Sequence, residues 1–235
     1  MHIQRKFAVA GVLVFGAGLA YAADQTILGN NFLVKNPGTT DKRKIVGKAK
    51  ESGSANTING NPVAAGATLT IRADGGSPSV QVFGLPQGTI TATGKPAWSG
   101  DATKGFKYKD PKGQNGPVKI AQIKKSASGT FSIKAVISGK NGTILVTPPN
   151  PGTGGCMLLG LNLGDTYSVS FEPGTGAQLT NKDGILFKAK KPTSEGTCLV
   201  TTTTTTTTTS STTTSTTLYG SPSRAFFDHV ASLLD

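Results

Sequence analysis

Residues 131–138 read FSIKAVIS, and this stretch is the clearest indication of how the chain folds. Phe131, Ile133, Ala135 and Ile137 alternate with a second set that contains two serines, a valine and Lys134. Successive side chains of a strand point to opposite faces, so this period of two predicts a strand with one buried and one exposed face.

The same period recurs along the chain between glycine-rich turns, and no stretch before residue 218 has helical spacing. Residues 23–200 are therefore predicted to form an all-β, antiparallel β-sandwich, and a β-barrel is the alternative architecture. The strongest hairpin signal is Lys140-Asn141-Gly142-Thr143. The other predicted strands bury Leu69, Ile71 and Ala73; Leu159, Leu161 and Leu163; Tyr167, Val169 and Phe171; and Ile185, Phe187 and Ala189.

The first 22 residues have the layout of an export signal. Arg5 and Lys6 precede fourteen apolar residues at 7–20, and Ala20-Tyr21-Ala22 supplies the small residues that a signal peptidase reads. Fourteen residues fall short of the ~20 that a membrane-spanning helix needs, so no transmembrane segment is predicted. We expect cleavage after Ala22 and export to the periplasm, the cell surface or the extracellular space.

Residues 201–217 are all threonine or serine, which predicts a disordered linker that cannot contribute to a core. Residues 218–235 form a short tail in which Ser223 can cap a helix. We expect this tail to dock onto a receptor, a surface partner or the β domain itself, the alternative being a disordered end. The apolar residues available for docking are Phe226, Phe227, Val230, Leu233 and Leu234.

A weak repeat with the pattern F-x-apolar-K-x-P occurs at 32–37, 106–111 and 187–192. It suggests a duplicated unit of roughly 75 residues, with repeats at about 27–100 and 101–200. The pattern is also what lysine-flanked strands that end at proline would produce. Both explanations stay open, as does the choice between one duplicated domain and two small ones.

The predicted β domain, residues 23–200, lacks reactive side chains that many enzymes use. After removal of the signal, His229 in the tail is the remaining histidine, which excludes Ser-His, Cys-His and histidine-ligated metal sites from residues 23–217. The chain's two cysteines, Cys156 and Cys198, are expected to form a disulfide in an oxidising compartment. We predict a non-enzymatic protein without catalytic residue, metal or cofactor. A polysaccharide lyase using Lys107, Tyr108 and Lys109 is the enzyme alternative, although alternation separates Tyr108 from both lysines.

Positive charge is concentrated in residues 23–149, which hold seventeen Lys and Arg against six Asp and Glu, whereas 150–200 hold four of each. On alternating strands these lysines would share an exposed face that attracts anionic glycans. Nucleic acid is the weaker candidate because arginines and aromatics are few. The alternative is that lysines keep strand edges from aggregating. The predicted binding residues are Lys42, Arg43, Lys44, Lys104, Lys107, Lys109, Lys112, Lys119, Lys124 and Lys125, with Lys48 and Lys50 extending the first cluster.

Trp98 offers a second way to bind sugars. It lies between Pro96 and Ser99-Gly100, which predicts a loop, and an exposed indole ring there could stack on a sugar. The alternative is that this ring covers one end of the sandwich. The two binding modes differ in their response to salt, because only contacts through lysine are screened by ions.

The lysine-rich β body, the poly-threonine stretch and the ending at 218–226, LYGSPSRAF, resemble a group of exported bacterial proteins of unknown function. The resemblance covers most of the mature chain, and residues 104–125 and the tail are its most distinctive parts. It implies that this layout recurs as a unit. It implies no activity and no site residues.

Overall fold

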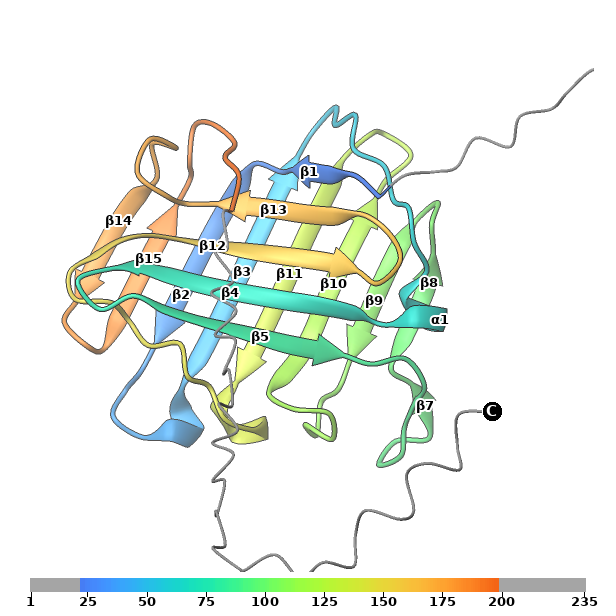
Figure 1. Cartoon of the computed structure of the whole chain (residues 1–235), viewed down its shortest axis with the longest axis horizontal. Helices are drawn as coiled ribbons and strands as arrows, with labels where there is room; N and C mark the ends of the chain where they lie inside the picture. Colours follow the sequence, from blue (N-terminus) through green and yellow to red (C-terminus); the bar gives the residue numbers. More distant parts are fainter. Residues whose placement is uncertain (1–21, 199–235) are drawn as a thin grey trace, which may run out of the picture. The chain divides into compact units, whose positions relative to one another are not determined.

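The computed structural model describes residues 22–198 (Figure 1). Almost all of the predicted signal peptide, the linker at 201–217 and the tail with Phe226, Phe227, Val230, Leu233 and Leu234 lie outside the described residues. The expectations for these segments stay predictions.

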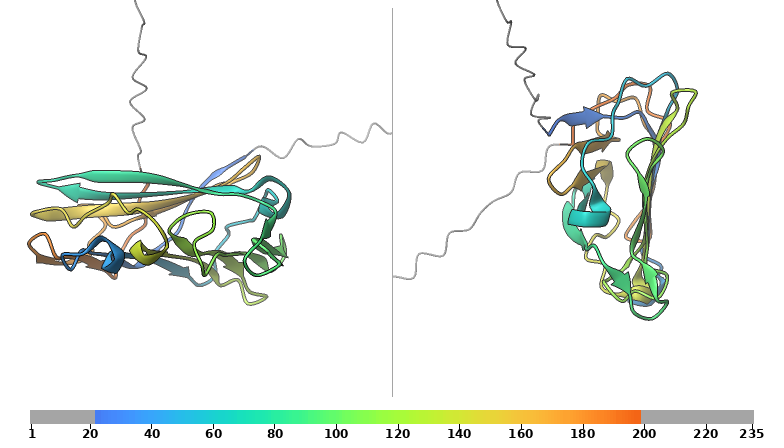
Figure 2. Two further views of the ribbon diagram at one scale, coloured as in Figure 1. Left: turned by 90° about the horizontal axis from the view of Figure 1, so that it is seen from below. Right: turned by 90° about the vertical axis from the view of Figure 1, so that its right-hand side faces the viewer.

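The described residues are mostly β-strands arranged in two sheets, and the two sheets form the two layers seen edge-on in Figure 2. Their strands cross steeply when the layers are viewed face-on (Figure 1). One sheet has five strands in the order β1 (Asp24–Thr26), β13 (Thr166–Ser170), β12 (Gly152–Leu161), β4 (Ala67–Gly75) and β5 (Ser79–Leu85). Its neighbours are antiparallel except for β1, which runs parallel to β13.

The other sheet has eight strands, and every neighbouring pair is antiparallel. The order is β14 (Gln178–Lys182), β15 (Leu186–Lys190), β2 (Gly29–Lys35), β3 (Lys44–Glu51), β11 (Phe131–Ser138), β10 (Val118–Lys125), β9 (Gly105–Lys109) and β8 (Trp98–Asp101). A two-stranded ribbon joins β6 (Thr89–Ile90) to β7 (Lys95–Pro96). The short helical segments are α1 (Pro62–Ala65) and the 3₁₀ turns η1 (Thr40–Lys42) and η2 (Gly139–Asn141).

The core lies between the sheets, and the alternation of 131–138 places its apolar set there. Phe131, Ile133, Ala135 and Ile137 are at most 2 % exposed. At the centre, Gly47 of β3 faces Met157 of β12, and a Cβ on that glycine would stand 2.6 Å from the methionine sulfur. A glycine is needed here because the interior is packed too tightly to accept another carbon atom.

The chain crosses from one sheet to the other where the sequence predicts a hairpin, and that prediction is wrong. Residues 139–141 form η2, and the chain then runs along the outer edge of β5 without joining a sheet. The reason is that β11 already has β3 on one side and β10 on the other. No free edge of β11 is left for the residues that follow Asn141-Gly142.

Other turns agree with the sequence, and two buried positions do not. The turns at Asp74-Gly75-Gly76 and Asp183-Gly184 join β4 to β5 and β14 to β15. Leu163, predicted to be buried, is 96 % exposed because β12 ends at Leu161 and Leu163 has a positive φ in the turn to β13. Ile185, 41 % exposed, likewise lies in the turn before β15.

Strands from both predicted repeat units share each sheet. β2 and β3 lie between β15 and β11, so the two units are not separate domains, and the described residues belong to one compact unit. The three F-x-apolar-K-x-P segments form β2, β9 and β15 of the eight-stranded sheet, with Phe32, Phe106 and Phe187 buried. β2 and β9 each begin an antiparallel hairpin, whereas β15 ends one.

Candidate functional site

The outer face of the eight-stranded sheet carries a row of lysines set by strand register. Lys190 of β15 is opposite Asn31 of β2, which is opposite Lys48 of β3. Lys48 is opposite Lys134 of β11, and Gln122 of β10 then connects Lys134 to Lys107 of β9. We call Lys190, Lys48, Lys134 and Lys107 the lysine row. With strands about 4.8 Å apart, it spans roughly 24 Å across the sheet.

Further lysines point outward from the same strands, above and below the row. Lys35 of β2 is opposite Lys44 of β3, and Ser132 of β11 is opposite both Lys50 and Lys124. Alternation places all of them on the face turned away from the core. We call this surface the lysine face; it consists of the lysine row together with Lys35, Lys44, Lys50, Lys109, Lys124 and Lys188.

No carboxylate within residues 22–198 neutralises the lysine face. Among the eight strands of this sheet, the acidic residues are Glu51 and Asp101. Glu51 is in register with buried Phe131, and its carboxylate accepts hydrogen bonds from Ser54 and Asn56. Asp101 accepts from the backbone amides of the following turn. The ion pairs between described side chains involve Arg72 and none involves a lysine.

A shallow depression of about 300 Å³ lies within the lysine face. Its lining combines cationic groups with neutral polar groups that can donate and accept hydrogen bonds. The charged members are Lys48, Lys50, Lys124 and Lys134, and the neutral polar members are Asn30, Gln122 and Ser132. This combination suits an anion that also carries hydroxyl groups.

The arrangement of these lysines carries an electrostatic cost. Lys48 is directly opposite Lys134, and Lys35 is directly opposite Lys44; like charges at such positions destabilise a sheet. The ammonium of neighbouring Lys190 is the main cause that lowers the pKa of Lys188 from its usual value. β3 and β11 are the two middle strands of the sheet, so protection of strand edges does not explain Lys48 and Lys134.

The structure divides the lysines predicted from the sequence into two groups. Lys44, Lys107, Lys109 and Lys124 lie on the lysine face, together with Lys48 and Lys50, which extended the first predicted cluster. The remaining predicted residues do not join them: Lys42 lies in η1, Lys104 and Lys112 lie in exposed turns, and Lys119 lies at an irregularity of β10. Arg43 donates to Asn36 and to the carbonyl of Ile144, and Lys125 donates to the carbonyl of Asn56.

Sequence reasoning about clusters missed Lys35 and Lys134, which are single lysines in apolar strands, and Lys188 and Lys190, which lie in a region, 150–200, with no net charge. Two signals could have found them. Lys134 is an outward position of the alternating strand 131–138, and Lys35, Lys188 and Lys190 belong to the F-x-apolar-K-x-P segments.

Trp98 does not lie in a loop, and its ring is not available for stacking. It begins β8, is 1 % exposed, donates its indole N–H to the carbonyl of Leu85 at 3.1 Å and lies 5.4 Å from the ring of Tyr108. The other aromatic side chains between residues 22 and 198 are at most 5 % exposed as well. A stacking platform therefore has no aromatic surface in this part of the chain; its buried aromatics are Phe32, Phe83, Trp98, Phe106, Tyr108, Phe131, Tyr167, Phe171 and Phe187.

The Lys107-Tyr108-Lys109 segment does not converge on a substrate site. Tyr108 is 1 % exposed and points into the core, whereas the two lysines point outward. Burial is the main cause that raises the pKa of Tyr108, so less of this side chain is present as the phenolate that would have to act as the base. The polysaccharide lyase mechanism suggested by these three residues lacks the geometry it needs.

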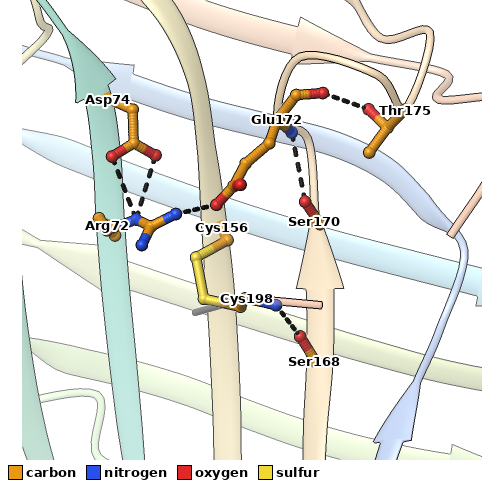
Figure 3. A network of polar contacts seen from close by, with 8 residues as sticks. All are labelled: Arg72, Asp74, Cys156, Ser168, Ser170, Glu172, Thr175 and Cys198. Atoms are coloured by element: carbon orange, nitrogen blue, oxygen red, sulfur yellow. Dashed lines mark hydrogen bonds and ion pairs between the residues drawn. A yellow bond between two sulfur atoms is a disulfide. The ribbon is translucent and has the colours of Figure 1, made fainter. Parts of the chain in front are cut away.

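A polar cluster lies on the outer side of the five-stranded sheet, next to the disulfide (Figure 3). Arg72 of β4 contacts the carboxylates of Asp74 and Glu172, and the backbone amide of Glu172 donates a hydrogen bond to the Ser170 hydroxyl. The predicted bond between Cys156 and Cys198 is confirmed and joins β12 to the segment after β15. The charges of this cluster are paired, and the described residues contain no group of three or more metal-binding side chains.

Comparisons of the chain with protein-family models, with curated proteins and with solved structures found no match. Among the described residues, no helix has the length and apolar character needed to cross a membrane.

Proposed function

We propose that this protein is an exported, non-enzymatic surface or extracellular module with a structural or adhesive role, which binds anionic polysaccharide through the lysine face. The observation that supports this most strongly is the lysine row, in which central strands hold directly opposed lysines without a carboxylate between them. Sites where a sequence accepts a local cost to stability are often functional.

A polysaccharide fits this surface better than a nucleic acid. The lysine row extends across the sheet from β15 to β9, so a linear polyanion can lie along it and contact several ammonium groups in succession. It offers lysines, which act as point charges, rather than arginines, which recognise phosphate and bases with a planar fork. Aromatic rings that would stack on bases are buried throughout the described residues.

Export is proposed on the sequence signal at 1–22 and is compatible with the disulfide, which persists in oxidising compartments. The absence of histidine between residues 23 and 217 and the burial of Tyr108 favour a non-enzymatic role.

The proposal is tested by retention of the mature chain, residues 23–235, on an immobilised polyuronate across a salt series. The double variant Lys48→Gln/Lys134→Gln should bind about tenfold more weakly at fixed salt, a change of ~1.4 kcal/mol. The matched control Lys42→Gln/Lys112→Gln makes the same charge change on exposed turn residues outside the lysine face. It should bind nearly as well as the unmodified chain.

Three outcomes would contradict the proposal. Equal losses in the two double variants would mean that net charge alone, and not the lysine face, causes retention. Retention on a neutral glucan that does not respond to salt would favour an aromatic or hydrogen-bonded site. Release of unsaturated products, followed by ultraviolet absorbance, would show a lyase and overturn the non-enzymatic assignment.

A further inference from the structure

Asp165 is a buried carboxylate at the start of β13, and the first described residues of the chain contact it. It is 0 % exposed. Its Oδ1 accepts from the backbone nitrogen of Ala23 at 2.9 Å and from the Asn59 side chain at 3.3 Å. Its Oδ2 accepts from the Gln25 side chain at 2.6 Å, from the Asn59 amide at 3.0 Å and from the Tyr167 hydroxyl at 3.4 Å.

All five donors belong to neutral groups, and no lysine or arginine among the described residues forms an ion pair with Asp165. A buried carboxylate is costly unless a counter-charge accompanies its hydrogen bonds. Asp110, which is also 0 % exposed, accepts from the backbone amides of Gly113, Gln114 and Asn115, and none of these donors lies at a predicted cleavage point.

The backbone of Ala23 is held in place around this contact. Its carbonyl accepts from the amide of Thr166 at 2.9 Å, and β1 then runs parallel to β13 from Asp24 onward. Ala22 and Ala23 are themselves exposed, so the peptide bond between them lies at the surface. This bond directly follows Ala20-Tyr21-Ala22, the small-residue pattern that signal peptidases recognise.

We propose that the Ala22–Ala23 bond is a processing site and that the α-ammonium released at Ala23 forms a partly buried ion pair with Asp165. A peptidase specific for small residues adds water across the bond, so that Ala22 leaves with a carboxylate and Ala23 keeps the ammonium. The amide donor seen at 2.9 Å becomes a cationic donor at the same position, and charge-assisted bonds are the stronger kind. This inference is independent of the lysine face, which lies on the other sheet.

Processing thus stabilises the fold by supplying the counter-charge that Asp165 otherwise lacks. It also holds β1 at the edge of the five-stranded sheet, with Ile27 buried behind it at 0 % exposure. A chain that keeps its leader, or is cut one residue away, places no ammonium at this carboxylate.

The first measurement is intact mass and N-terminal sequence of the full 235-residue chain after export from an expression host. The expected N-terminus is Ala23; a different one would overturn the assignment of the processing site.

The second measurement compares thermal unfolding of the mature chain, residues 23–235, in three forms. One has the free amine, one is acetylated at Ala23, and one carries a single extra glycine before Ala23, which keeps the charge but moves it away from Asp165. We expect acetylation and the extra glycine each to lower Tm by about 5 °C, the shift expected for losing a partly buried ion pair in a domain of this size.

Combining acetylation of Ala23 with the Asp165→Asn variant tests whether the change in Tm comes from this ion pair. Acetylation should lower the Tm of that variant by much less than it lowers the Tm of the unmodified chain. In Asp110→Asn, the matched buried carboxylate, acetylation should keep its full effect. If the Asp165→Asn variant does not fold, the comparison of the free, acetylated and glycine-extended forms still tests the proposal. Equal Tm values in all three forms would overturn the ion pair.

Discussion

At the scale of single residues, Lys134 shows that the role of an outward-facing side chain depends on its neighbours in the sheet. In the sequence it is one lysine in an apolar strand. In the sheet it is directly opposite Lys48, and it lines the depression that Lys50 and Lys124 also line. A residue of this kind is expected to lower stability and raise affinity for an anion.

The variant Lys134→Glu tests this trade-off. Replacing a like-charged pair by an opposite-charged pair should raise the free energy of unfolding by about 0.5–1 kcal/mol in urea at low salt. The same change should weaken polyuronate binding more than Lys134→Gln does. Lys112→Glu, on an exposed turn, serves as the control and should leave stability nearly unchanged. A less stable Lys134→Glu variant at low salt would contradict the repulsion between Lys48 and Lys134.

Trp98 is the residue for which local sequence was most misleading. Pro96 and Ser99-Gly100 predict a loop around it, yet the residue pairs with Tyr108 as a strand position. The alternative role as a cover for the core was closer, because the ring is buried and its N–H is bonded to Leu85. The ring is buried against Tyr108 of β9 and is bonded to Leu85, and the residues directly adjacent to Trp98 specify neither contact.

At the scale of elements, residues 143–147 show how the edge of β5 is covered. Ile144 and Val146 are buried, and the side chain of Gln81 bonds the carbonyl of Thr143 and the amide of Leu145. Ser79 bonds Thr147 in the same way. Side chains thus occupy part of an edge that would otherwise be open to another strand.

Gln81→Ala should loosen this covering without unfolding the sandwich. We expect the Leu145 amide to exchange its hydrogen faster, since it loses its 2.7 Å acceptor. The free energy of unfolding should fall by only about 1 kcal/mol because both bonds are exposed to water. Val82→Ala, a neighbouring exposed position of β5, is the control for hydrogen exchange. Unchanged exchange at Leu145 would show that Gln81 does not hold this segment.

At the scale of the whole molecule, the two sheets have different surfaces. The outer side of the eight-stranded sheet is lysine-rich, whereas the five-stranded sheet carries the disulfide and the paired charges of Arg72, Asp74 and Glu172. A polyanion is therefore expected to bind the outer side of the eight-stranded sheet and not the five-stranded sheet.

The pH dependence of binding follows from this surface. Retention on a sulfated polysaccharide should be constant from about pH 6 to about pH 9, because no histidine lies between residues 23 and 217 and lysines titrate above this range. Binding should weaken first on the alkaline side, because neighbouring Lys190 lowers the pKa of Lys188 from its usual value. Lys188→Gln should remove that first step, and His229→Ala should change nothing. A transition near pH 6.5 that His229→Ala leaves in place would contradict this account.

The β class, the disulfide and the buried side of most strands could be predicted from the order of the amino acids alone. Alternation is a local property, so Phe131, Ile133, Ala135 and Ile137 could be assigned to the core without knowing their neighbours. Two cysteines leave one intramolecular pairing, which made Cys156–Cys198 predictable. The enrichment of lysine before residue 150 was visible from composition alone.

The order of the strands in each sheet is known from the folded chain alone, and the candidate site depends on that order. Pairing of β11 with β3 and β10 excluded the hairpin at Asn141-Gly142 and placed Lys134 beside Lys48, 86 positions earlier in the chain. Pairing of β15 with β2 added Lys188 and Lys190 from a segment whose net charge is neutral. These contacts join residues distant in sequence, and packing between the sheets selects them, so no local pattern could reveal them.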